Sequence, residues 1–230
     1  MSETVGITIA RQLGSGGSRI GQSVARRLGY VLIDRQILQQ AARELRVEEA
    51  EVEDREERLE SFWEKLVSSY AMACPYRIGT PPLCLVSDEA LAEVERRIIT
   101  ELAVKGPCVI LGRGAFHLLR GKARLFNIMV HAPLRFRVER VMSIYPVRSK
   151  AEAIQMIERS DQDRCRYIRA FTGLDWLDTR NYDLTINMGK IDFATAEEMI
   201  ADLALRLSSV DVRSWANEPV RAADPIIKVA

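Results

Sequence analysis

The sequence contains little of what marks metal-binding, secreted or membrane-spanning proteins. Its four cysteines, which lie far apart with no histidine cluster beside them, are Cys74, Cys84, Cys108 and Cys165. Without a C-x-x-C pair, the usual zinc and dithiol redox motifs are excluded. No run of 18 apolar residues occurs, and residues 1–6 lack the basic start and apolar run of a signal peptide. We therefore expect a cytoplasmic protein with reduced cysteines, no metal site of its own and no membrane partner.

An excess of charge of one sign is also missing. The 33 basic and 32 acidic side chains leave a net charge of +1, so no overall field draws the protein to nucleic acid or to an anionic membrane. We expect no nucleic-acid partner, and any anion site must be local. Arginine outnumbers lysine, and its planar guanidinium suits bidentate phosphate contacts. This excess favours a phosphorylated ligand, although an arginine-rich genome explains it equally well.

The distribution of apolar residues predicts a single α/β domain. The 230 residues are 47% hydrophobic and 28% charged, which is typical of a globular chain. Short apolar runs predict strands at 5–10, 30–33, 108–111, 125–131 and 184–186. Apolar residues at helical spacing predict helices between them, including 20–28, 91–102 and 194–207, and Pro133 is expected as the first residue of another. This alternation is typical of a parallel sheet covered by helices on both faces.

Two segments are expected to depart from this plan. Residues 36–87 contain a charged, mostly helical stretch and an irregular stretch with prolines, which we interpret as an insertion on the acceptor side. Residues 210–230 have no periodicity and contain Pro219 and Pro225, so we expect a tail that packs loosely or contacts a second subunit. Homo-oligomerisation therefore stays open. The domain itself is predicted to span residues 1–209.

A glycine-rich loop joins the first predicted strand directly to the first predicted helix. Its residues are Gly14, Ser15, Gly16, Gly17, Ser18 and Arg19. Successive amides in such a loop, together with the positive end of the following helix, bind phosphate without any side chain. The simpler interpretation is a tight turn that needs glycine for a positive φ. The Walker pattern G-x-x-x-x-G-K-[ST] is absent, because no lysine follows the glycines.

Two other segments end at the same edge of the predicted sheet. Asp34 follows the second strand, and the turn at 112–114 follows the third. Ligands of parallel sheets bind beyond the carboxyl ends of the strands, so both segments are expected to converge with the glycine loop. Asp34 also lies 20 residues after Gly14, as in a dinucleotide-binding fold. In that alternative, however, G-x-G-x-x-G fails because Arg19 takes the third glycine position.

A late, arginine-rich segment is predicted to be helical. A capping box at 149–152 starts the helix, and Arg159, Asp163 and Arg166 then recur on one face. Two arginines on either side of an aspartate can hold phosphates while the aspartate orients one guanidinium, and Arg164 adds charge. The plainer interpretation is a solvated, salt-bridged helix face.

The order and spacing of these segments resemble the cytidylate-kinase-like family, relatives of the nucleoside monophosphate kinases. The matching segments are Ile7–Gly17, Leu32–Asp34, Val109–Gly114, Arg159–Gly173 and Asn181–Leu184. The resemblance implies an α/β fold of three layers, α/β/α, like that of P-loop NTPases, with a five-stranded parallel sheet. It also implies ATP bound with Mg²⁺ at the glycine loop, a helical lid at 149–180, and Arg113 in contact with an acceptor nucleotide.

The chain also departs from the family's pattern. Gly17 stands where a lysine bridges the phosphates, and Arg19 stands where a Ser or Thr binds magnesium. On the acceptor side, Gly114 replaces an aspartate and Arg35 replaces a serine. Specificity for cytidine is therefore not implied.

Three hypotheses remain at this stage. The first is a kinase-like enzyme that passes the ATP γ-phosphoryl group to a small acceptor, such as the nucleoside monophosphate CMP. Its catalytic residues would be Arg159, Asp163, Arg164 and Arg166, and its acceptor-binding residues Asp34, Arg35 and Arg113. The second is a catalytically weak or inactive relative that senses a nucleotide, which the missing lysine favours. The third is the dinucleotide-binding module.

Overall fold

The computed structural model describes residues 5–34 and 89–209 of the chain. Its sheet is parallel throughout and has the strand order β2-β3-β1-β4-β5, with β1 at the centre. The strands are β1 (Gly6–Arg11), β2 (Val31–Ile33), β3 (Cys108–Leu111), β4 (Leu125–His131) and β5 (Leu184–Asn187). The expected five-stranded parallel sheet is thus confirmed, and each strand lies where a short apolar run predicted it.

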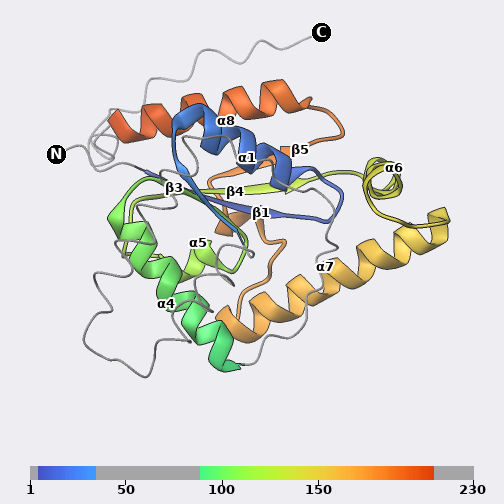
Figure 1. The fold of residues 1–230 in the computed structure, drawn as a ribbon, viewed down its shortest axis with the longest axis horizontal. Helices are drawn as coiled ribbons and strands as arrows, with labels where there is room; N and C mark the ends of the chain where they lie inside the picture. Colours follow the sequence, from blue (N-terminus) through green and yellow to red (C-terminus); the bar gives the residue numbers. More distant parts are fainter. Residues whose placement is uncertain (1–4, 35–88, 210–230) are drawn as a thin grey trace, which may run out of the picture.

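Helices cover both faces of this sheet, as Figure 1 shows, with α1 and α8 together on one face and α4, α5 and α7 toward the other. The helices are α1 (Gly17–Leu28), α4 (Glu89–Lys105), α5 (Ala115–Leu118), α6 (Leu134–Ile144), α7 (Lys150–Thr172) and α8 (Phe193–Ser209), with a 3-10 turn η1 (Thr179–Asn181) before β5. The architecture is therefore a three-layer α/β/α sandwich.

The core divides along the two faces of the central strand. Ile7 and Ile9 of β1 are fully buried and pack with Ile20 and Val24 of α1 and with residues of α8. Ala10 points to the opposite face and packs with residues of α5 and α7. This alternation is the period of two that a strand imposes on its side chains. Because both faces are apolar, β1 is held from both sides, and the loop at its carboxyl end starts from a rigid position.

Helix starts agree with the sequence in one case and differ by one residue in another. The Ser149 side chain accepts a hydrogen bond of 3.1 Å from the Glu152 amide, which confirms the predicted cap of α7. The Glu152 carboxylate, however, accepts from the Arg148 amide at 2.7 Å. Pro133 was expected inside α6, but it is the N-cap, because its ψ of 147° is extended.

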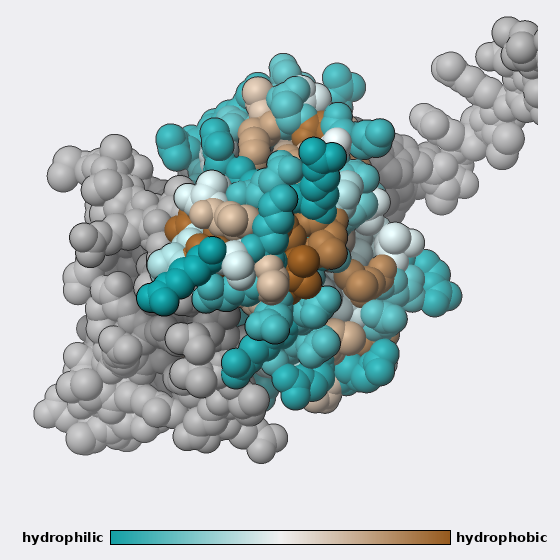
Figure 2. Space-filling model, turned by 90° about the vertical axis from the view of Figure 1, so that its right-hand side faces the viewer, coloured by the Kyte–Doolittle hydropathy of each residue, from teal (hydrophilic) through white to brown (hydrophobic). Residues whose placement is uncertain are grey.

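Several predictions concern residues outside the described ranges. They include the helical and irregular segments of the insertion at 36–87, the side chain of Arg35, and the tail at 210–230. Within residues 5–34 and 89–209, none of the helices has the length and hydropathy that a membrane crossing requires. Figure 2 views the side on which α6 and α7 lie, and hydrophilic side chains cover most of the described surface there.

The core assignment predicts the effect of truncating the central strand. Ile7→Ala should lower the free energy of unfolding by about 3–4 kcal/mol, because Ile7 is 0% exposed and its loss leaves a cavity. Leu205→Ala is the matched control: Leu205 is 54% exposed on α8, so its truncation should cost less than about 0.5 kcal/mol. Urea denaturation followed by circular dichroism measures both, and equal losses would contradict this core.

Candidate functional site

The loop between β1 and α1 needs glycine at two positions. Gly14 and Gly16 have φ values of 81° and 89°, in the left-handed region that glycine adopts without strain. A Cβ atom on Gly14 would lie 2.7 Å from the carbonyl oxygen of Arg137, and one on Gly16 would lie 2.5 Å from Cε1 of Phe193. The loop is therefore packed tightly against α6 and against the start of α8.

The amides of this loop differ in what they bind. The Ser15 amide donates to the Gln12 carbonyl at 3.2 Å, and the Ser15 hydroxyl, fully buried, donates to the same oxygen at 2.8 Å. By contrast, within residues 5–34 and 89–209 no acceptor is hydrogen-bonded to the amides of Gly16, Gly17 or Ser18. These amides lie at the start of α1, where the helix dipole is positive. The arrangement is suited to an anion held by backbone groups.

Two arginines lie beside these amides on one aromatic ring. The guanidinium carbons of Arg19 and Arg140 lie 4.5 Å and 4.7 Å from the centre of the Phe193 ring. Stacking on the ring is a favourable cation–π contact. Burial and then the charge of Arg19 lower the pKa of Arg140, because both disfavour its charged form. A bound anion would relieve this repulsion between the two cations.

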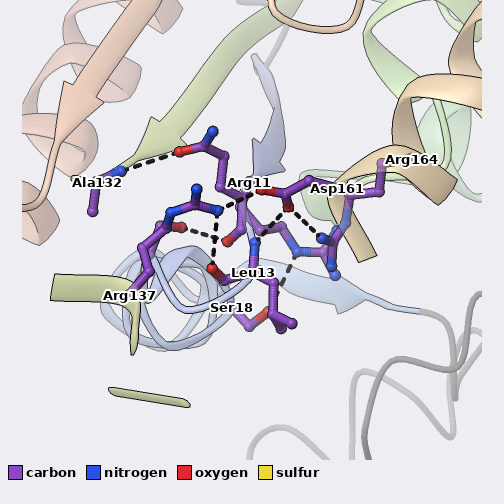
Figure 3. Close-up of polar contacts among 9 residues, drawn as sticks. Arg11, Leu13, Ser18, Ala132, Arg137, Asp161 and Arg164 are labelled. Atoms are coloured by element: carbon purple, nitrogen blue, oxygen red, sulfur yellow. Dashed lines mark hydrogen bonds and ion pairs between the residues drawn. The ribbon is translucent and has the colours of Figure 1, made fainter. Parts of the chain in front are cut away.

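One carboxylate joins the loop to the helices that follow β4. Asp161 of α7 accepts from the Leu13 amide at 3.1 Å and from Arg164 at 3.1 Å, and it is ion-paired with Arg137 of α6 (Figure 3). Arg137 also donates to the Leu13 carbonyl at 3.4 Å. Leu13 itself is buried with apolar residues of α6 and α7. The start of the glycine loop is therefore held at both its backbone groups by side chains from two helices.

The other residues of the arginine-rich helix are placed differently. Asp163 pairs with Arg166, whose side chain is 77% exposed, and Arg159 is exposed on the same helix. Arg164 points inward: its side chain is 18% exposed, and its guanidinium carbon lies 6.0 Å from the centre of the Trp176 ring. Of the arginines predicted on this helix, the structure therefore brings Arg164 toward the glycine loop and leaves Arg159 and Arg166 at the surface.

A cavity of about 110 Å³ lies between the carboxyl ends of β1 and β3 and the inner side of α7. Phe116, Tyr167 and Trp176 give it aromatic walls, and its charged lining residues are Arg11, Arg113 and Arg164. The hydroxyl of Ser160, which also lines it, is buried and has no hydrogen-bond partner among the described residues. Cations beside aromatic walls suit a small anionic ligand with an apolar or ring-shaped part.

The turn after β3 carries its arginine in an uncommon conformation. Arg113 has a φ of 58° between Gly112 and Gly114, whose φ values are also positive. Left-handed backbone is unusual for a residue other than glycine, and such residues cluster at functional sites. The turn aims Arg113 at the cavity.

Asp34 lies directly after β2, is 3% exposed and does not line the cavity. No group of three or more His, Cys, Asp or Glu side chains is placed to hold a metal in the described part of the chain.

Sequence reasoning missed Asp161, Arg137 and Arg11. Asp161 lies two residues before Asp163 and carries no signal that separates the two acids. Arg137 belongs to a helix in which arginine is frequent, and it is buried to 8% exposure only because α7 supplies its counter-charge. Burial of an arginine beside a partly buried carboxylate follows from helix packing, which the sequence pattern did not specify.

The strand order and the loop together define a class of protein. A parallel sheet with β1 between β3 and β4, and a glycine loop leading into α1, is the α/β fold of P-loop kinases. The order differs from the 3-2-1-4-5-6 of dinucleotide-binding folds, in which β2 lies beside β1. The third sequence hypothesis therefore has no support from the topology.

Comparison with known proteins agrees with this class. Residues 6–190 match the model of the cytidylate kinase-like family, and the chain belongs to that family. A cytidylate kinase from Pyrococcus horikoshii is 37% identical over 98 residues, which are 43% of this chain and 49% of that kinase. The match thus spans about half the length of this relative.

One solved structure has a similar fold at low identity. An uncharacterized protein from Eubacterium ventriosum has a TM-score of 0.64 and 21% identity, covering 87% of this chain and 98% of the other. Shikimate kinase from Bacteroides thetaiotaomicron has a TM-score of 0.49 and 14% identity over the same shares of the two chains.

The role of Asp161 predicts a difference between two acids on one helix. Asp161→Asn should lower the free energy of unfolding by about 2–4 kcal/mol, because it leaves the charge of Arg137, whose side chain is 10% exposed, without compensation. Asp163→Asn, whose partner is at the surface, should cost less than about 1 kcal/mol. Urea denaturation gives both values. A larger loss for Asp163→Asn would show that Asp161 is not what holds the loop.

Proposed function

We propose that this protein binds ATP at the Gly14–Arg19 loop and transfers its γ-phosphoryl group to a small acceptor such as a nucleoside monophosphate. The observation that carries the proposal is the row of amides at Gly16, Gly17 and Ser18, without acceptors among the described residues, at the positive end of α1. They lie beside Arg19 and Arg140. Backbone donors and arginines together are what a polyphosphate requires.

The acceptor would bind in the cavity between the carboxyl ends of β1 and β3 and α7. Arg113 and Arg164 line it and would hold an anionic group, while Phe116, Tyr167 and Trp176 offer stacking surfaces. The buried Ser160 hydroxyl would then gain a hydrogen-bond partner from the acceptor. Asp34 and Arg35 are proposed to complete the acceptor side from the end of β2.

The charge of the transferred group would be neutralised mainly by arginine. Phosphoryl transfer depends on positioning and on charge stabilisation rather than on covalent chemistry by the protein. Arg164 already points inward, and Arg159 and Arg166 would reach the phosphates if residues 149–180 act as a lid, with Asp163 orienting Arg166. Such a movement would have to release the bond between Asp161 and the Leu13 amide, which holds α7 on the loop.

Magnesium would accompany the nucleotide as its complex. Arg19, which takes the hydroxyl position of the family's pattern, stacks on Phe193 and offers no oxygen ligand. The buried carboxylate of Asp34 at the end of β2 fits better as the partner of a metal-bound water. When bound, the ion would screen charge between the phosphates.

A catalytically weak or inactive nucleotide sensor is the second candidate. It is favoured by Gly17, which carries no charge where phosphoryl-transfer enzymes of this fold place lysine. The same loop and arginines would serve it, since binding requires no transfer.

Calorimetry and a turnover assay separate the two candidates. Mg-ATP and each nucleoside monophosphate are titrated into the protein, and transfer is then followed by coupled ADP release. Binding with product supports the kinase, and tight binding without product supports the sensor. Because a ligand at 100 times its Kd adds about 2.7 kcal/mol to the free energy of unfolding, a thermal-shift panel gives an independent readout. Absence of binding to every nucleotide would overturn both.

The inward arginine of α7 gives a sharper test of the site. Arg164→Ala should lower kcat/KM about 100-fold, which corresponds to about 2.7 kcal/mol of lost stabilisation in the transition state. Arg135→Ala is the control, since the Arg135 side chain is 92% exposed on α6 and pairs there with the exposed Glu139. Steady-state kinetics measure both variants. An Arg164→Ala enzyme as active as the control would remove this residue from the mechanism.

A further inference from the structure

The loop departs from the Walker pattern at two positions that are related in space. In G-x-x-x-x-G-K-[ST], with Gly16 as the second glycine, the lysine position is Gly17 and the first glycine position is Arg11. The chain thus has a cation where the pattern has glycine, and glycine where the pattern has a cation.

The structure places the Arg11 side chain in the space that a side chain at position 17 would need. A Cβ atom on Gly17 would lie 2.6 Å from the Cβ of Arg11 and 3.2 Å from its Cγ. From there Arg11 extends along the loop, and its Nε donates to the Ser18 hydroxyl at 3.3 Å (Figure 3). Position 17 therefore has to be glycine while Arg11 lies there.

A second glycine accommodates the other end of this side chain. Nη1 of Arg11 lies against Gly112, in the turn after β3, where a Cβ atom would collide with it. Arg11 also lines the cavity, together with Arg113 and Arg164. Its guanidinium consequently lies between the amides of Gly16–Ser18 and the cavity proposed for the acceptor, which is the region that a transferred group would cross.

We propose that Arg11 is a catalytic residue that supplies the positive charge of the missing lysine. The proposal rests on the proposed phosphotransferase function. In the reaction, the bond between the γ-phosphorus and its bridging oxygen breaks, and its electron pair stays on ADP. A new bond forms to an acceptor oxygen, and any proton on that oxygen leaves to solvent. Arg11 donates hydrogen bonds to the phosphoryl oxygens during this step and is itself unchanged.

A purely structural role for Arg11 makes different predictions. If the side chain only links the loop to the turn after β3, its removal would lower the melting temperature and weaken nucleotide binding together. A catalytic cation instead contributes mostly in the transition state, so its loss reduces kcat and leaves binding nearly intact.

The test moves the charge from one position to the other. Arg11→Ala should lower kcat about 100-fold and change the Kd for ATP by less than about tenfold. Gly17→Lys alone should lower the melting temperature, because the new Cβ would collide with Arg11. In the double variant Arg11→Gly/Gly17→Lys the Cβ and Cγ of Arg11 no longer obstruct position 17, and the Cβ of Val130 at 3.2 Å is the remaining close neighbour. Its kcat should be at least about tenfold higher than that of Arg11→Gly alone. Arg135→Ala serves as the control with unchanged kcat.

Each outcome decides the role of Arg11. Failure of the double variant to regain kcat, with a melting temperature restored, would overturn the proposal in favour of the structural role. If the wild-type protein transfers no phosphoryl group, the proposed kinase function is refuted. The role of Arg11 is then tested by nucleotide binding. In that case, an Arg11→Ala variant that loses the preference for ATP over ADP supports a cation at the terminal phosphate, and an unchanged preference overturns it.

Discussion

The geometry of the site depends on the carboxylate of Asp161. It accepts from the Leu13 amide and from Arg164 and pairs with the buried Arg137, so it fixes the glycine loop, α6 and α7 to one another. A buried ion pair adds little net stability, because desolvation offsets most of the attraction. The main effect of this ion pair is to fix one relative position of the glycine loop, α6 and α7. With Asp161 in place, α7 cannot slide along the loop without breaking the contacts of this carboxylate with Leu13, Arg137 and Arg164, and the inward direction of Arg164 agrees with this constraint.

The fold was predictable to the extent that burial decides it. The runs at 108–111 and 125–131 are apolar on both faces, as strands of a covered parallel sheet must be, and they are β3 and β4 in the structure. Ser149 was predictable because a cap is a local interaction. The role of Asp161 was not predictable, since the sequence pattern singled out Asp163, which lies two residues further along the helix and so points in another direction. Which acid reaches the Leu13 amide depends on how α7 is rotated over the sheet, and that rotation is set by the packing of Ala153 and Ile157 against Leu13 and α6.

Arginine outnumbers acid around the loop, and the protein accommodates this excess in three ways. Arg137 and Arg164 share one carboxylate, Arg19 and Arg140 lie on the ring of Phe193, and Arg11 runs along the loop to the turn after β3. Each arrangement holds a cation in place before any ligand arrives. Preorganised charge of this kind reduces the reorganisation that binding a polyanion would otherwise require. The arginine-rich composition is thus partly concentrated where it has a physical use.

The supports of the glycine loop come from much later in the chain than the loop itself. Gly14 packs against Arg137, Leu13 is held by Asp161, and Gly16 packs against Phe193. During synthesis on the ribosome, residues 14–18 emerge long before these partners exist. The loop therefore acquires its final shape only when the start of α8 has been translated, and a nascent chain shorter than this cannot present the finished site. Folding of the loop is therefore a late step in the folding of the domain.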